Sequence, residues 1–143
     1  MRDRTVSELR SALERKRVEP EAIDHAVEEL TASGLLNDAR FAACFAHDKR
    51  VLERWGSERI ERELHRRGVP PELVEEAVSS RGRDQELPAA IELLGARLGT
   101  PPRSDGERQR AWQLLVRKGY EPELAYDAVR AYEAGPLGRR PAA

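Results

Sequence analysis

The chain contains an internal repeat of 51 residues, and this period constrains its fold more than any other feature of the sequence. The positions that recur at this interval are Pro20, Pro71 and Pro122, Leu13, Leu64 and Leu115, and Val27, Val78 and Val129. Self-similarity at a fixed period of this length is typical of arrays in which each unit gains stability by stacking on its neighbours. The sequence therefore predicts a repeat architecture.

Each copy of the repeat has the pattern of a helix, a turn and a second helix. The three segments read RKRVEPEAIDHAV, RRGVPPELVEEAV and RKGYEPELAYDAV, each with cations, a turn, a Pro-Glu pair and an apolar stripe at helical spacing. A further helix precedes the second pair, over Asp38–Arg54, and the third, over about Leu87–Leu98; none precedes the first. We therefore predict an all-α, elongated and curved array of tandem three-helix repeats whose first repeat is short by one helix.

Glycine, proline and capping residues predict where the units begin and end. We expect a partial repeat of two helices at 1–33, a central three-helix repeat at 34–80, a C-terminal three-helix repeat at 81–134 and a disordered tail at 135–143. Thr5 or Ser7 is expected to cap the first helix, and Asp84 the sixth, with Pro88 moving its true start toward Leu87. The segment Gly99–Gly106 is the clearest loop. No window alternates like a strand, so no strand is expected.

The composition favours thin helical layers over a thick core. Charged residues make up 36% of the chain and hydrophobic residues 39%, and the formal net charge is −1. A chain whose whole surface holds nucleic acid is usually clearly basic, so this balance argues against that class of protein. Neither a signal peptide nor a membrane span is found, so we expect a soluble, cytoplasmic monomer without membrane contact. Cys44, the one cysteine, is expected to be a buried small hydrophobe.

The sequence offers little that resembles catalytic chemistry. His47 and Asp48 are adjacent and so face different sides of a helix, while His25 and Glu28 make at most one pair, too few for a metal site. Phosphate-binding loops, metalloprotease motifs and nucleophile elbows are not found. We expect a protein that is not an enzyme, with no catalytic residue, cofactor or metal. Trp55 and Trp112 fit packing at helix ends, and exposed anchors for a partner are the alternative.

Charge follows the repeat and predicts a binding surface. Residues 49–67 carry seven cations and four anions, whereas residues 19–33 carry five carboxylates and no Lys or Arg. Cations at helix C-termini are favoured by the helix dipole, which is one explanation of pairs such as Arg66–Arg67; a basic stripe that binds a partner is the other. The dipole does not explain the cations that lie within helices or in a first turn. We predict that the partner-binding residues, for a protein groove or a polyanion, are Lys49, Arg50, Arg54, Arg59, Arg62, Arg66 and Arg67.

The stretch Gly34–Val78 resembles the RecX family of bacterial regulatory proteins, and the likeness extends from about Arg4 to Tyr132. The residues that carry it are Leu36, Asn37, Asp38, Phe41–Ala42, Lys49–Arg50, Gly56, Arg59–Ile60, Leu64 and Gly68–Val69. Physical reasoning gives several of them structural roles: Asn37 and Asp38 as helix caps, and Phe41 with Phe45 as core. We therefore expect the motif residues Leu36, Asn37, Asp38, Phe41, Gly56, Leu64 and Gly68 to be mainly structural.

The resemblance implies negative regulation of the RecA recombinase. RecX-like proteins bind RecA, engage the groove of its filament on single-stranded DNA, and lower its ATPase, strand-exchange and coprotease activities. RecA and the RecA–single-stranded DNA filament are thus the expected partners. Family members commonly have another helix before the segment matching Thr5–Lys16, and weaker inhibition is expected if that helix contacts RecA. Weak direct DNA binding is a further expectation beside these partners. The alternatives to RecA regulation are a protein that binds DNA directly through helix-turn-helix modules and an adaptor scaffold unrelated to recombination.

Overall fold

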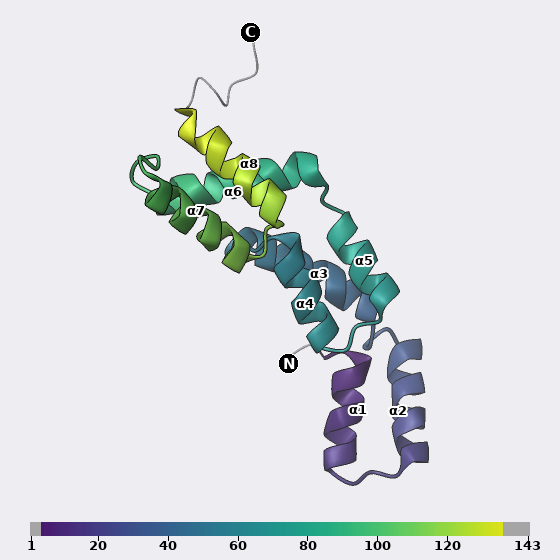
Figure 1. Cartoon of the computed structure of the whole chain (residues 1–143). Coiled ribbons are helices and arrows are strands. Elements are labelled where there is room, and N and C mark those ends of the chain that lie inside the picture. Colours follow the sequence, from purple (N-terminus) through teal and green to yellow (C-terminus); the bar gives the residue numbers. More distant parts are fainter. Residues whose placement is uncertain (1–3, 136–143) are drawn as a thin grey trace. The chain divides into compact units, whose positions relative to one another are not determined.

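A computed structural model of the chain describes residues 4–135, which form eight α-helices and no strand (Figure 1). The helices are α1 Val6–Arg15, α2 Pro20–Ala32, α3 Asp38–Leu52, α4 Ser57–Arg66, α5 Pro71–Ser79, α6 Arg83–Arg97, α7 Asp105–Lys118 and α8 Pro122–Glu133. Two helices precede Asp38 and two sets of three follow, which confirms the order predicted from the repeat. The predicted tail, apart from Gly135, lies outside the described residues.

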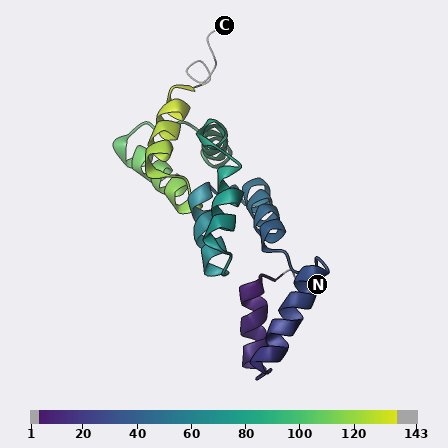
Figure 2. The same cartoon turned by 90° about the vertical axis from the view of Figure 1, so that its right-hand side faces the viewer.

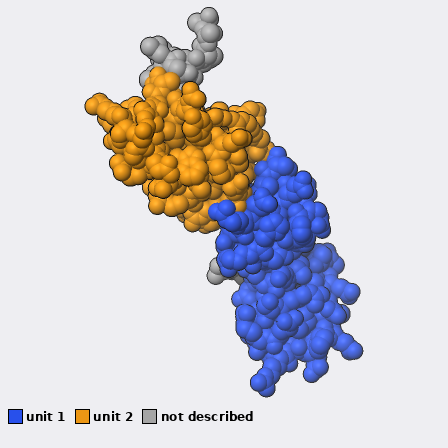
Figure 3. Space-filling view, in the orientation of Figure 1, with its two compact units in different colours: residues 1–48, 61–79 blue, residues 49–60, 80–143 orange. Residues whose placement is uncertain are grey.

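The contacts divide the chain into two compact units (Figure 3). Unit 1 comprises residues 1–48 and 61–79, and unit 2 comprises residues 49–60 and 80–143. The boundary passes through α3 and α4, so each of these helices contributes residues to both units. The division into repeats at residues 33 and 80 stays a prediction about sequence units, because the contacts group the residues differently.

The first two helices lie side by side in two views of the molecule (Figures 1 and 2). Thr5, one of the two predicted caps, begins α1 with a capping box: its Oγ1 accepts from the Glu8 N–H at 3.1 Å, and Glu8 Oε1 accepts from the Thr5 N–H at 3.1 Å. Pro20 occupies the start of α2, where its missing N–H costs nothing. Ile23 of α2 is buried at 3% exposure.

The Asn-Asp pair before α3 has two different structural tasks in unit 1. Asn37 Oδ1 accepts from the Arg40 N–H at 3.0 Å and so caps α3. Asp38 Oδ1 instead accepts from the Val6 N–H at 3.0 Å, which joins the start of α3 to the start of α1. Each acceptor satisfies a backbone donor that a helix N-terminus leaves unpaired.

Glycine 68 lies where a side chain has no room. It ends α4 with φ +81°, and a Cβ added there would lie 2.3 Å from the Ser7 Oγ. Next to it, the Thr5 Oγ1 donates to the Arg67 carbonyl at 2.8 Å. The backbone at the end of α4 is therefore packed against side chains at the start of α1.

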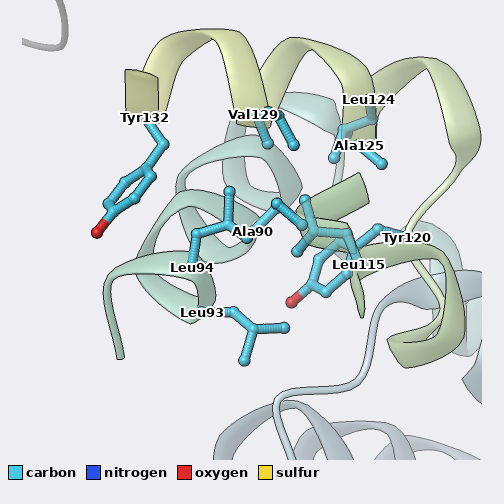
Figure 4. Close-up of a cluster of buried hydrophobic side chains, with 11 residues drawn as sticks. Ala90, Leu93, Leu94, Leu115, Tyr120, Leu124, Ala125, Val129 and Tyr132 are labelled. Carbon is cyan, nitrogen blue, oxygen red and sulfur yellow. The ribbon is translucent and has the colours of Figure 1, made fainter. Parts of the chain in front are cut away.

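Unit 2 contains a hydrophobic cluster built by α6, α7 and α8 (Figure 4). Leu93 and Leu94 of α6 and Leu115 of α7 are fully buried, and full burial of a leucine contributes about 1.5–3 kcal/mol to stability. The buried residues of α8 follow the apolar stripe at helical spacing that was predicted for each repeat; they are Leu124, Ala125, Ala128, Val129 and Tyr132. The helical period of this segment therefore predicted its buried face correctly.

Two glycines bring the segment before α4 against the end of α7 within unit 2. A Cβ added to Gly56 would lie 2.5 Å from the carbonyl carbon of Gly119, and one added to Gly119 would lie 2.3 Å from the Arg59 Cβ. The close approach permits two backbone hydrogen bonds: the Gly56 N–H donates to the Lys118 carbonyl at 2.8 Å, and the Glu58 N–H donates to the Gly119 carbonyl at 2.9 Å. Both glycines are buried.

The predicted start of the sixth helix is wrong. The helix begins at Arg83 with Gly82 as its N-cap, so Asp84 is no cap and Pro88 lies inside the helix. An interior proline removes a backbone hydrogen bond and costs about 3 kcal/mol. The early start places Glu86 in the first turns, where it is buried at 6% exposure and accepts from the Ser57 N–H at 2.6 Å. This tertiary contact is absent from the local pattern.

The expectation for Cys44 in α3 is also wrong, because Cys44 is exposed. The buried residues of α3 are Ala42 and Ala46. Because each residue turns the helix by about 100°, position 44 lies about 200° from position 42 and faces away from the packed side.

Candidate partner-binding surface

The structure distributes the predicted binding residues over both units. Lys49, Arg50, Arg54 and Arg59 belong to unit 2, and Arg62, Arg66 and Arg67 belong to unit 1. Their environments differ widely, from the interior of a unit to open solvent. The role of the seven as a binding set stays a prediction.

Arg67 is held inside unit 1. Its side chain is 12% exposed, and it donates from Nε and Nη2 to the two Glu8 carboxylate oxygens at 2.9 and 3.0 Å. The guanidinium carbon also lies 4.5 Å from the Phe41 ring centre and 5.8 Å from that of Phe45, and the two rings stack at 5.9 Å. Phe41 and Phe45 are therefore half-buried beneath a cation, which modifies their predicted role as simple core residues.

Arg50 is likewise held inside unit 2. It donates to the Ser80 Oγ at 3.1 Å and to the Ser57 Oγ at 3.2 Å. Burial, followed by the nearby positive charge of Arg81, lowers the pKa of Arg50. Arg81 donates from Nε to Glu86 Oε2 at 2.5 Å, so Arg50 lies beside a buried ion pair. A charge reversal at Arg50 would disturb this polar cluster as well as any surface.

Trp55 is flanked by two predicted binding residues. The Lys49 Nζ lies 4.7 Å from the indole ring centre and the Arg59 guanidinium carbon 4.1 Å from it. The indole is half-buried, so it matches neither a fully packed residue nor an open anchor. Next to it, Arg54 has φ 57° and its carbonyl accepts from the Tyr120 hydroxyl at 3.2 Å. Burial raises the pKa of Tyr120, which keeps this hydroxyl a donor.

Three predicted cations have exposed side chains. Arg54 and Arg62 are exposed and form no ion pair within the described residues. Arg66 is also exposed but donates to Glu63, and this hydrogen bond raises the pKa of Arg66. Arg66 and Arg67 also line a polar hollow of unit 1, together with Arg4, Ser7, Glu8, Ser11 and Arg15. The exposed cations are thus the members of the predicted set that are available to a partner.

The structure adds a cationic cluster that the predicted set lacks. It consists of Arg97 at the end of α6 and Arg110, Arg117 and Lys118 of α7. Burial, then the positive charges of Arg97 and Arg59, lowers the pKa of Lys118. The excess of cations in residues 103–118 was a sequence signal for the part on α7, whereas Arg97 joins only through the packing of α6 on α7.

Within the described residues there is no group of three or more side chains that could hold a metal ion. Two of the three histidines make a single contact each: His25 lies 3.2 Å from Glu29, and His65 lies 3.9 Å from Glu61. None of the helices in the described part of the chain is long and apolar enough to span a membrane.

Known proteins resemble the chain in sequence over most of its length. A family model described as "RecX, second three-helix domain" matches residues 37–78. The chain is 33% identical to "Regulatory protein RecX" of Amycolatopsis mediterranei over 132 residues, which cover 91% of this chain and 75% of that protein. It is 37% identical to "Regulatory protein RecX" of Trichlorobacter lovleyi over 127 residues, which cover 86% of this chain and 82% of that protein.

Solved structures show a similar fold. The crystal structure of RecX from Lactobacillus salivarius matches with a TM-score of 0.81 over 93% of this chain and 88% of that chain, at 17% identity. A second "Crystal structure of regulatory protein RecX" matches with a TM-score of 0.74 over 90% of this chain and 64% of that chain, at 18% identity. At identities of 17% and 18%, these two structures show that the fold is similar.

Proposed function

We propose that this chain, which belongs to the RecX family of regulatory proteins, is a negative regulator of the RecA recombinase. In this proposal it binds RecA, or the filament that RecA forms on single-stranded DNA, and lowers the ATPase, strand-exchange and coprotease activities of RecA. The observation that carries the proposal is the family relation, with 37% identity over 82% of a regulatory relative. The target itself comes from what the family resemblance implies.

The surface supports action by protein contact. The formal net charge of −1 provides no long-range attraction for a polyanion, since cationic patches are offset by acidic segments such as residues 19–33. Arg54 and Arg62 are exposed and outside any ion pair of the described residues, so a protein surface with carboxylates can pair with them. This reasoning favours the recombinase over naked DNA as the main partner.

The ATPase activity of RecA on single-stranded DNA tests the proposal. With this chain titrated in, we expect the ATPase rate to fall as the chain approaches equivalence with RecA. An unchanged rate at a stoichiometric excess would refute the proposal. If the ATPase rate falls only at concentrations at which the chain also binds naked single-stranded DNA at physiological salt, the DNA-binding alternative is supported instead.

A double variant examines the predicted surface. Arg54→Glu with Arg62→Glu reverses two exposed cations and leaves the internal Arg50 and Arg67 untouched, so we expect inhibition to weaken without a loss of fold. The matched control is Lys16→Glu with Arg17→Glu, which reverses two exposed cations at the end of α1. Full inhibition by the folded Arg54/Arg62 variant would remove these residues from the binding surface.

A further inference from the structure

A shallow pocket of about 380 Å³ lies between the end of α6 and α7 in unit 2. Three arginines line it: Arg97 from α6, and Arg110 and Arg117 from α7. Between them the wall includes the half-buried leucines Leu98 and Leu114. The pocket thus combines guanidinium groups with an apolar wall.

The charges of these arginines are not neutralised by the protein. Arg97, Arg110 and Arg117 form no ion pair within the described residues. The one carboxylate that lines the pocket, Glu107, accepts from the Arg103 N–H at 2.7 Å and so is engaged by the backbone of its own loop. Lys118 and Arg59 add further positive charge nearby: burial, then the charges of Arg97 and Arg59, lowers the pKa of Lys118.

Helix electrostatics account for only part of this cluster. Arg97 and Arg117 lie in the last turns of α6 and α7, where the helix dipole favours a cation. Arg110 lies in the middle of α7, where the dipole has no effect, and Arg59 lies in the first turn of α4, where the dipole opposes a cation. Mutual repulsion disfavours the gathering of these side chains, so the stability of the unit does not explain the cluster. A bound anion would explain it, because an anion offsets the repulsion between the cations.

The form of the pocket distinguishes between anions. Single-stranded nucleic acid is held by cations together with open aromatic faces, but among the described residues no aromatic side chain lines this pocket. An acidic peptide needs guanidinium groups for its carboxylates and an apolar wall for a side chain between them. Arg110 and Arg117 are two helical turns apart, about 10.5 Å along the axis, a spacing that carboxylates on a peptide can match.

We infer that the pocket between α6 and α7 binds an acidic peptide segment, whose carboxylates pair with Arg97, Arg110 and Arg117 while an apolar side chain rests against Leu98 and Leu114. The inference does not depend on the proposed regulation of RecA. Binding of the acidic peptide can therefore be measured with the purified chain in the absence of RecA.

Fluorescence anisotropy with three labelled probes tests the inference. The probes are a helix-forming peptide of alternating glutamate and leucine clusters, the same peptide with glutamine in place of every glutamate, and an oligothymidylate. The full chain is compared with the variant Arg97→Gln/Arg110→Gln/Arg117→Gln and with the control Arg15→Gln/Lys16→Gln/Arg17→Gln. The control removes the same charge from exposed positions in unit 1.

We expect the acidic peptide to bind the wild-type chain and the control alike, and the pocket variant at least about tenfold more weakly, because three ion pairs are lost. Circular dichroism checks the fold, and the single variant Arg110→Gln, at an exposed position of α7, reports binding if the triple variant unfolds. Equal binding of the glutamine peptide, or undiminished binding by the folded variants, overturns the inference. The inference is also overturned if the wild-type chain binds the oligothymidylate more tightly than the acidic peptide and the pocket variant loses this binding. It is overturned as well if none of the probes binds.

Discussion

Replacing Gly56 with alanine inserts a methyl group where the backbone of another segment already lies. The new Cβ would be 2.5 Å from the Gly119 carbonyl carbon and oxygen and 2.7 Å from the Tyr120 nitrogen. Ordinary contact needs about 3.5 Å, so the two segments must separate by about 1 Å. The contacting atoms belong to the backbone, and no side-chain rotation relieves the overlap.

The separation would also break hydrogen bonds. The Gly56 N–H to Lys118 carbonyl bond, at 2.8 Å, and the Glu58 N–H to Gly119 carbonyl bond, at 2.9 Å, would lengthen beyond hydrogen-bonding distance. Two lost bonds cost about 1–3 kcal/mol and overpacking about as much again, so we expect Gly56→Ala to lower the free energy of unfolding by about 2–6 kcal/mol. A Tm decrease of at least about 10 °C would accompany it.

Tryptophan fluorescence during urea and thermal unfolding measures this change, because Trp55 and Trp112 both belong to unit 2. Gly99→Ala is the matched control: a Cβ at Gly99 meets no atom within 4 Å. It should leave the free energy of unfolding within about 0.5 kcal/mol of wild type. The reasoning is refuted if Gly56→Ala is as stable as this control.

Three further predictions concern stability and exposure. Arg67→Ala should lower the free energy of unfolding by about 2–4 kcal/mol in chemical unfolding followed by circular dichroism, because it strips Glu8 of its partner and uncovers Phe41; Arg62→Ala should change it little, and equal effects would contradict the internal role of Arg67. Leu115→Ala should cost about 2–5 kcal/mol in the same assay, since Leu115 is fully buried, and a loss below about 1 kcal/mol would show a looser cluster. Cys44 should react with a thiol reagent in the native protein about as fast as in the unfolded chain, and strong protection would contradict its exposure.

Local patterns predicted the helices well because their determinants are local. The proline at the start of α8 and the stripe from Leu124 to Tyr132 specify a helix and its buried face without reference to other segments. Thr5 and Glu8 form their capping box within one turn. The prediction was correct where the two partners of an interaction lie only a few residues apart in the sequence.

The errors arise where a distant partner decides. Glu86 accepts a hydrogen bond from the Ser57 backbone, and a helix that begins at Arg83 places Glu86 within reach of it. This early start puts Pro88 inside the helix, a position that is unfavourable for proline. Arg67 pairs with Glu8, far away in the sequence, so a cation that looks like surface charge is internal. The gathering of Arg97 with Arg117 likewise depends on how α6 packs on α7.

Sedimentation of RecA filaments assembled on single-stranded DNA tests the central claim that this chain acts by contact with the recombinase. The chain is mixed with filaments, with naked single-stranded DNA and with RecA alone, at physiological salt, and the pelleted fraction is measured. We expect the chain to sediment with filaments and to remain in solution with naked DNA. No sedimentation with filaments, or equal sedimentation with naked DNA, would contradict the account.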